Sequence, residues 1–288
     1  GFQPGLLRFH GKRLHADGQY TIRKLIAGRH SQTLATQPVQ VISPVSSART
    51  PGHHDPYRLH RVALGPLLPA ARQESREAVY SAVSAIGERT FLAFLVQQGL
   101  AALWDEVLRR TDATARFSDD FITSIHQARL RNAGLYLAQK NSLGSIRKIL
   151  EDAGIRHVIY KGAHIRERLY EEPALRPAID IDVLVPDKDK FAAVKAFRAD
   201  GYELFAKEEI VSHEANLSKG LVTVDLHWDI MRPGRTRIPV VDTLLQTRAD
   251  YGHYWGMSDA ATLFVMLVHP VFAKYGTTPQ ASLVRLVD

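Results

Sequence analysis

Apolar and polar positions follow a helical spacing through the middle of the chain. From about residue 71, apolar side chains recur at this spacing through AVYSAVSAIG, TFLAFLVQQGLAALWDEVL and FITSIHQARLRNAGLYLAQKNSLGSIRKILEDAG, as in an amphipathic helix. Leu137, Ile146 and Ile149 fall on one stripe of the last segment, and Gly154 can end it. We therefore predict a helical region over residues 71–153.

The spacing changes to a period of two after Gly154. Short apolar runs read HVIYKG, AIDIDVLV, GYELF and LVTVDLHW, with the helical segment AHIRERLY after the first and DKDKFAAVKAFRADG after the second. This order predicts a small mixed β-sheet whose later strands pair antiparallel. The predicted fold class is α+β, with a sheet-containing core and C-terminal helices over residues 154–288.

Residues 1–70 show neither spacing and carry the net charge of the chain. They hold nine Lys or Arg against two acidic residues, seven of the 14 prolines and six of the 13 histidines. We predict a basic, poorly ordered and largely irregular extension. A nucleic-acid-binding arm is a second interpretation, but the aromatic residues of a stacking platform are not interleaved with these charges. The chain starts without Met and ends without a helix-stop signal, so we expect a fragment.

Composition narrows the class of protein further. With 288 residues, of which 45% are apolar, the chain can bury a full core. It contains no Cys, which excludes disulfides, zinc–thiolate sites and thiol nucleophiles and fits a reducing compartment. No long uncharged apolar run occurs, and residues 1–10 lack the apolar core of a signal peptide. We expect a cytoplasmic protein without a membrane-spanning segment.

Two acidic residues interrupt the apolar run at 179–185. Strand alternation places the Ile and Val side chains of this run on one face and Asp180 and Asp182 together on the other. The Cα atoms of alternate strand residues lie roughly 6 to 7 Å apart, so both carboxylates can reach one cation. Without a cation each carboxylate raises the pKa of the other. The pattern therefore indicates a divalent metal.

A third acidic residue lies in a later run of the same kind. In the segment TVDLHW, alternation sets Asp225 and His227 on one face, while Val224 and Leu226 point to the core. A single Asp in a strand favours a solvated edge position. Three such residues in neighbouring apolar runs favour a metal site, because an unpaired buried carboxylate is costly.

The residues Lys161 and Gly162 lie where an apolar strand turns into a helix. Backbone N–H groups and the helix dipole favour phosphate at such a turn, Gly162 permits close approach, and Lys161 supplies a point charge. Most strand-Gly-helix turns are only turns, so this feature alone is weak.

Together these segments resemble a known family over about residues 90 to 288. The matching stretches are VIYKGAH at 158–164, LY at 169–170, LRPAIDIDVLV at 175–185, GY at 201–202 and VDLHW at 224–228. They resemble the polymerase-beta-like minimal nucleotidyltransferases, within them an uncharacterised bacterial branch with a Lys-Gly turn. The chain has Ala163 where the wider superfamily has Ser or Gly, and a long interval between Gly162 and Asp180.

The resemblance implies an activity and a set of site residues. Asp180, Asp182 and Asp225 would bind one or two Mg²⁺ or Mn²⁺ ions, with Asp225 as a candidate general base. Lys161 and Arg176, with the Gly162 turn, would contact the phosphates of a nucleoside triphosphate such as ATP. For Arg176, a surface arginine in a proline-flanked turn is an equally good interpretation. The reaction would transfer a nucleoside monophosphate to an acceptor and release pyrophosphate.

The acceptor side is less defined by the sequence. His227, Lys219 and His213 are candidates, although a structural histidine and a solvated strand face explain them as well. The acceptor can be a small molecule, a peptide, a protein or RNA. Two other functions stay open: a catalytically degenerate nucleotide-binding module, and an RNA-binding or RNA-modifying protein that uses the basic residues 1–70.

Overall fold

The computed structural model describes residues 57–67, 73–205, 214–231, 237–271 and 283–288. Its contacts divide the chain into one unit at Gly1–Asp55 and a compact unit at Pro56–Asp288. The helices and strands that the structure describes all lie in the second unit. Most of the predicted basic extension, residues 1–56 and 68–70, lies outside the described residues.

The N-terminal part of the compact unit is helical. Its elements are α2 (Arg58–Leu64), η1 (Gly65–Leu67), α3 (Gln73–Ile86), α4 (Glu88–Gln97), α5 (Ala101–Arg110), η2 (Thr114–Arg116) and α6 (Asp119–Asp152). They pack around one apolar cluster in which Trp104 is fully buried and donates its indole N–H to the carbonyl of Ala63, 2.8 Å away.

Helix α2 begins inside the segment 1–70 that we predicted to be irregular. Residues 58–67 fall in the segment predicted to be irregular, yet they form α2 and η1. Leu59, Val62 and Ala63 have helical spacing, and Val62 and Ala63 are buried in the helical cluster. The surrounding prolines and histidines conceal this short amphipathic pattern.

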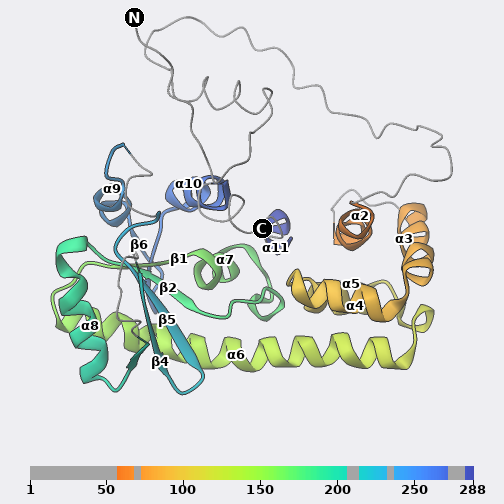
Figure 1. Cartoon of the computed structure of the whole chain (residues 1–288), viewed down its shortest axis with the longest axis horizontal. Coiled ribbons are helices and arrows are strands. Elements are labelled where there is room, and N and C mark those ends of the chain that lie inside the picture. Colours follow the sequence, from red (N-terminus) through yellow and green to blue (C-terminus); the bar gives the residue numbers. More distant parts are fainter. Residues whose placement is uncertain (1–56, 68–72, 206–213, 232–236, 272–282) are drawn as a thin grey trace, which may run out of the picture. The chain divides into compact units, whose positions relative to one another are not determined.

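Helix α6 contacts both the helical part and the sheet part of the unit. It has 34 residues, its Ser118 N-cap accepts a hydrogen bond from the backbone N–H of Phe121, and it contacts α4, α5, α8 and β5 (Figure 1). Ile146 is fully buried, whereas Leu137 is 58% exposed, so the predicted stripe is wrong at Leu137. The apolar side of α6 changes along its length because each end packs on a different partner.

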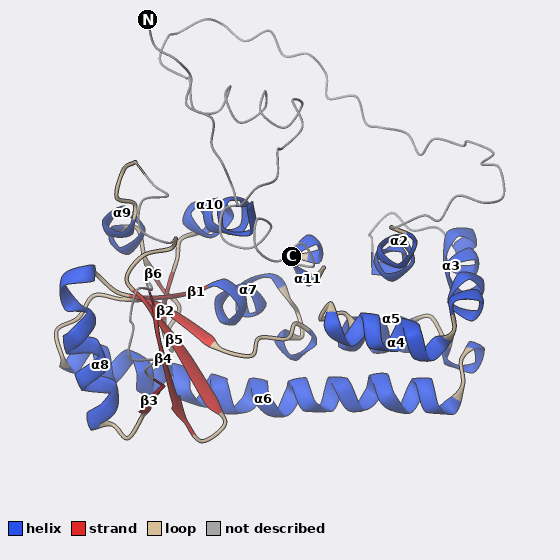
Figure 2. Ribbon diagram, in the orientation of Figure 1, coloured by secondary structure: helices blue, strands red, loops and turns tan. Residues whose placement is uncertain are grey.

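The sheet has seven strands in the order β3-β4-β5-β2-β1-β7-β6 (Figure 2). The strands are β1 (Val158–Tyr160), β2 (Ile181–Leu184), β3 (Glu203–Phe205), β4 (Glu214–Lys219), β5 (Val222–His227), β6 (Ala249–Asp250) and β7 (Trp255–Gly256). β3, β4 and β5 pair antiparallel and β2 pairs parallel with β5. The predicted α+β class with a small mixed sheet is confirmed.

Helices cover the sheet with two apolar layers. The remaining helices are α7 (Lys161–Leu169), η3 (Pro173–Leu175), η4 (Asp187–Asp189), α8 (Lys190–Ala199), α9 (Val241–Gln246), α10 (Asp259–His269) and α11 (Val284–Val287). Ile181, Val183 and Val185 pack in the cluster that includes α6 and α8, and Leu184 packs in the cluster that includes α9 and α10. Ile179, predicted to join the first layer, is 77% exposed because it precedes β2.

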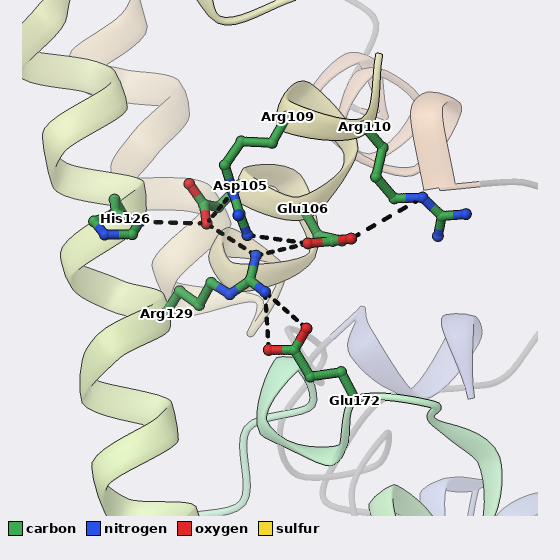
Figure 3. A network of polar contacts seen from close by, with 7 residues as sticks. All are labelled: Asp105, Glu106, Arg109, Arg110, His126, Arg129 and Glu172. Atoms are coloured by element: carbon green, nitrogen blue, oxygen red, sulfur yellow. Dashed lines mark hydrogen bonds and ion pairs between the residues drawn. The ribbon is translucent and has the colours of Figure 1, made fainter. Parts of the chain in front are cut away.

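A network of charged side chains ties the helical part to the turn before η3 (Figure 3). Its members are Asp105, Glu106, Arg109 and Arg110 on α5, His126 and Arg129 on α6, and Glu172. Arg129 donates to Glu106 at 2.6 Å and to both carboxylate oxygens of Glu172 at 2.7 and 2.8 Å. Asp105, 2% exposed, lies 3.3 Å from Arg129. The turn that leads toward Asp180 is thereby fixed to α5 and α6.

No single helix in the described ranges is both long and apolar enough to cross a membrane. Residues Arg76–Ile86 and Glu88–Gln97 meet that criterion only as a pair, and the pair is bent by 108°.

Candidate active site

The centre of the sheet brings two carboxylates side by side. Asp182 on β2 is the register partner of Asp225 on the parallel strand β5. Across the same row, Tyr160 on β1 pairs with Asp182, and Asn216 on β4 pairs with Asp225. A carboxylate oxygen of each aspartate and a ring nitrogen of His227 all lie within 4.8 Å of one another. The structure thus brings Asp182 and Asp225 together as predicted.

Asp182 is buried and interacts with a cation and an imidazole. Its Oδ1 accepts a hydrogen bond from Lys161 Nζ at 2.8 Å and lies 2.9 Å from Nε2 of His227. Burial raises the pKa of Asp182, but the charge of Lys161 and the hydrogen bond with His227 outweigh it. The pKa of Asp182 therefore lies well below its ordinary value, and this carboxylate is ionised at neutral pH.

Asp225 and Asp180 show the opposite shift. Burial and the charge of Asp182 raise the pKa of Asp225, although Asn216 donates a hydrogen bond to it. Burial, then Asp182 and Asp225, raise the pKa of Asp180 to about 7. The three carboxylates together therefore carry fewer than three negative charges near neutral pH. A divalent cation would allow Asp180 and Asp225 to ionise.

Asp180 differs from the prediction in its backbone. It lies in a bend one residue before β2 and not on the strand itself. It is absent from the group of mutually close metal-ligand atoms formed by Asp182, Asp225 and His227. The charges of Asp182 and Asp225 contribute to the raised pKa of Asp180, but its place in a bend departs from the strand alternation on which the prediction rests.

Lys161 directs its side chain toward the carboxylates. It is the first residue of α7 and has a φ of 52°, a left-handed value that is unusual for a residue with a side chain. Its Nζ lies 3.3 Å from Nε2 of His227 and 4.9 Å from the ring centre of Tyr160, in addition to its bond with Asp182. The strained backbone at the Lys-Gly turn therefore holds a cation against the site.

The space beside Gly162 is occupied by the chain itself. A Cβ at this position would lie 2.7 Å from Nη1 of Arg176 and 3.1 Å from Cβ of Ala178. Arg176 is 7% exposed, and its Nη2 donates to the carboxylate of Asp288 at 2.6 Å. Because Gly162 has no side chain, the guanidinium of Arg176 can lie against it. The interpretation of Arg176 as a surface arginine is wrong, because its side chain is buried.

The three acceptor-side candidates lie in different places. His227 is 1% exposed and belongs to the site. Lys219, at the end of β4, donates to Asp200 at 2.9 Å and packs over the ring of Tyr202, away from the carboxylates. His213 lies outside the described residues.

Three further residues of the site were not predicted from the sequence. Tyr160 is fully buried, and its hydroxyl has no hydrogen-bond partner among the described residues. Burial, followed by the charge of Asp182, raises the pKa of Tyr160, so the phenol keeps its proton. Glu214 lies 3.3 Å from Nδ1 of His227, and Asn216 orients Asp225. Strand alternation in EANLSK puts Glu214 and Asn216 on one face, which is the signal that could have identified them.

The donor atoms fit a divalent cation. Carboxylate oxygens suit Mg²⁺ and Mn²⁺, and a neutral imidazole nitrogen suits Mn²⁺ and other transition ions. Carboxylates with raised pKa values, such as Asp180 and Asp225, are typical of sites where a cation compensates the charge.

Comparison with known proteins agrees with this geometry. The sequence model of one protein family, described as uncharacterised nucleotidyltransferase, matches residues 84–288. The match includes every described residue of the site and most of the helical part. Comparison with curated proteins gives no match. The family match covers well over half of the chain and confirms the resemblance to nucleotidyltransferases. The chain belongs to this nucleotidyltransferase family.

Proposed function

We propose that this nucleotidyltransferase is metal-dependent and moves a nucleoside monophosphate from a nucleoside triphosphate to an acceptor, with release of pyrophosphate. The observation that carries the proposal is the pairing of Asp182 and Asp225 across two parallel strands, with Asp180 beside them. ATP is the first donor to test. The acceptor is a hydroxyl or phosphate group of a small molecule, a peptide, a protein or RNA.

The carboxylates Asp180, Asp182 and Asp225 would hold Mg²⁺ or Mn²⁺. When bound, the ion neutralises phosphate charge and favours ionisation of the acceptor hydroxyl. Asp182 suits the role of a permanent ligand, because its pKa is well below the ordinary value. Asp225, beside Asp182 on the neighbouring strand, is the candidate acceptor for the proton of the acceptor hydroxyl.

The step that we propose is a single in-line displacement. The acceptor oxygen forms a bond to the α-phosphorus, and its proton goes to Asp225. The bond between the α-phosphorus and the bridging oxygen breaks, and pyrophosphate leaves. Lys161, held by its backbone against the site, lies in a position to share its charge between Asp182 and the departing phosphates.

The test compares the variant Asp182→Asn with the wild type and with Asp187→Asn. Asp187 lies in η4 just after β2, and its side chain is 68% exposed. Each protein is incubated with Mg²⁺ or Mn²⁺, α-labelled nucleotide and candidate acceptors, and labelled product, pyrophosphate and acceptor mass are measured. We expect Asp182→Asn to lose transfer by about a thousandfold and Asp187→Asn to retain it. Full activity of a folded Asp182→Asn protein would refute the mechanism.

The same experiment separates turnover from a degenerate nucleotide-binding module. Ala163 lies where the wider superfamily has Ser or Gly and cannot offer a serine hydroxyl to phosphate, which motivates that second function. Calorimetry that detects nucleotide and metal binding, without pyrophosphate release for any nucleotide or acceptor, would favour it.

A further inference from the structure

Each ring nitrogen of His227 lies close to a carboxylate. Nε2 lies 2.9 Å from Oδ1 of Asp182, and Nδ1 lies 3.3 Å from Oε2 of Glu214. The ring of Tyr160 meets the imidazole edge-on, with the ring centres 5.5 Å apart. The side chain is 1% exposed. These contacts fix the direction in which Nε2 points, which is toward the two aspartates.

The position of Nε2 suits a metal ligand. In octahedral coordination with bonds of about 2.1 Å, adjacent ligand atoms lie about 3 Å apart. The 2.9 Å between Nε2 of His227 and Oδ1 of Asp182 matches that separation. A carboxylate oxygen of Asp225 lies within 4.8 Å of a carboxylate oxygen of Asp182 and of a ring nitrogen of His227. Asp182 and Asp225 are register partners on β2 and β5, and His227 lies two residues after Asp225 on the same strand.

Glu214 supplies the usual second partner of a metal-binding histidine. A ligating imidazole almost always donates its other N–H to a carboxylate or a carbonyl, which fixes the tautomer. Nε2 shares a hydrogen bond with Asp182. A proton on Nδ1, which faces Glu214, would instead leave the lone pair of Nε2 to bind an ion beside Asp182, Asp225 and the ammonium of Lys161. The lysine cation then lies next to the donors that a metal ion would use.

We propose that His227, through Nε2, is a metal ligand together with Asp182 and Asp225, and that Glu214 is its positioning residue. A nitrogen donor gives the site a preference for Mn²⁺ over Mg²⁺, because Mg²⁺ strongly prefers oxygen ligands whereas imidazole suits transition ions. This inference rests on the proposed metal-dependent function and adds the identity of a ligand and the choice of ion.

The competing interpretation is that His227 only hydrogen-bonds to Asp182. Distance alone does not distinguish the two, since 2.9 Å is also an ordinary hydrogen-bond length. Direct detection of a metal–nitrogen bond does. The test therefore uses Mn²⁺ without nucleotide, because this ion is paramagnetic and reports nitrogen nuclei bound to it.

The experiment uses the full chain and measures two quantities. Calorimetry gives the affinities for Mn²⁺ and Mg²⁺, and electron spin-echo envelope modulation of the Mn²⁺-loaded protein detects the nitrogen coupling. The wild type should bind Mn²⁺ at least about tenfold more tightly than Mg²⁺. Labelling the histidines with ¹⁵N should convert the ¹⁴N modulation to the ¹⁵N pattern.

Three variants complete the test. His227→Gln should lose the nitrogen modulation and bind Mn²⁺ about tenfold to a hundredfold more weakly, and Glu214→Gln should weaken binding by a similar factor but keep the modulation. His253→Gln is the control, because His253 is an exposed histidine in the turn before β7. It should match the wild type in both quantities.

The outcomes that overturn the inference differ from those that overturn the proposed function. Mn²⁺ binding without nitrogen modulation in the wild type, accompanied by normal nucleotide transfer, refutes the histidine ligand alone. Absence of Mn²⁺ binding in the wild type also refutes the histidine ligand, whereas nucleotide transfer that proceeds without a divalent ion refutes the metal-dependent function. The measurement on the wild type decides the question even if His227→Gln does not fold.

Discussion

The variant Asp180→Asn should make the metal-free protein more stable at pH 8 and leave its stability almost unchanged near pH 4. Burial and the charges of Asp182 and Asp225 raise the pKa of Asp180 from 3.8 to about 7. A folded state with such a carboxyl keeps a proton that the unfolded chain releases. The free energy of unfolding therefore falls as pH rises from about 4 to about 7, and the full cost remains above that range.

The size of the effect follows from the same pKa. A difference of about three pKa units corresponds to at most about 4 kcal/mol. Asp225 shares the titration, which lowers the contribution of Asp180 alone, so we expect a gain of about 2–3 kcal/mol at pH 8. Near pH 4 the wild-type carboxyl is protonated in the folded state and resembles the amide in shape and charge.

Urea denaturation in the presence of a chelator measures this gain. Unfolding of the wild type, Asp180→Asn and Asp152→Asn is followed at pH 4.5 and pH 8 by tryptophan fluorescence. Asp152 is a suitable control because its side chain is 64% exposed and pairs with Lys148 on the surface of α6. Equal stabilities of Asp180→Asn and wild type at pH 8, or a loss of stability there, would refute the electrostatic reasoning. Added Mn²⁺ should stabilise the wild type more than the variant.

Two further predictions concern the frame around the site. Gly162→Ala should destabilise the protein by about 1–3 kcal/mol, because the new Cβ meets the guanidinium of Arg176 at 2.7 Å. Gly144→Ala, at an exposed position of α6 with open space around it, should stabilise by about 0.5–1 kcal/mol; equal effects of the two substitutions in urea denaturation would contradict the packing at Gly162. Arg129→Met should lower the free energy of unfolding by about 1–3 kcal/mol, because it removes contacts with α5 and with the turn before η3. Arg131 is exposed, so Arg131→Met should hardly change the stability. Equal melting temperatures of Arg129→Met and Arg131→Met would show that the charged network does not stabilise the fold.

Local patterns in the sequence predict part of this structure well. Ile181, Val183 and Val185 pack in one apolar cluster and Leu184 packs in another, as strand alternation requires, although every residue of β2 is buried. Asp182 and Asp225 face each other because each lies in an apolar run that forms a strand of one sheet. The change from helical to alternating spacing after Gly154 matches the end of α6 and the start of the sheet.

Features that depend on distant contacts could not be predicted. The partner of Arg176 is Asp288, 112 positions away, and no periodic pattern relates the two. Lys161 points to Asp182 because of its left-handed backbone, which a residue with a side chain rarely adopts. Ile179 and Asp180 fall outside β2 because hydrogen bonding to β1 and β5 begins at residues 181–182. Register and strand ends are set by neighbouring strands, and a single sequence does not contain that information.

The length of α6 has a mechanical consequence. A helix of 34 residues is about 50 Å long at the usual rise per residue, and it packs against α4 and α5 at one end and against β5 and α8 at the other. A continuous helix leaves no flexible joint at which the two ends could swing independently. The helical part and the sheet should therefore unfold in a single cooperative transition. A force applied to the helical part should displace the strands together with it, as one rigid body.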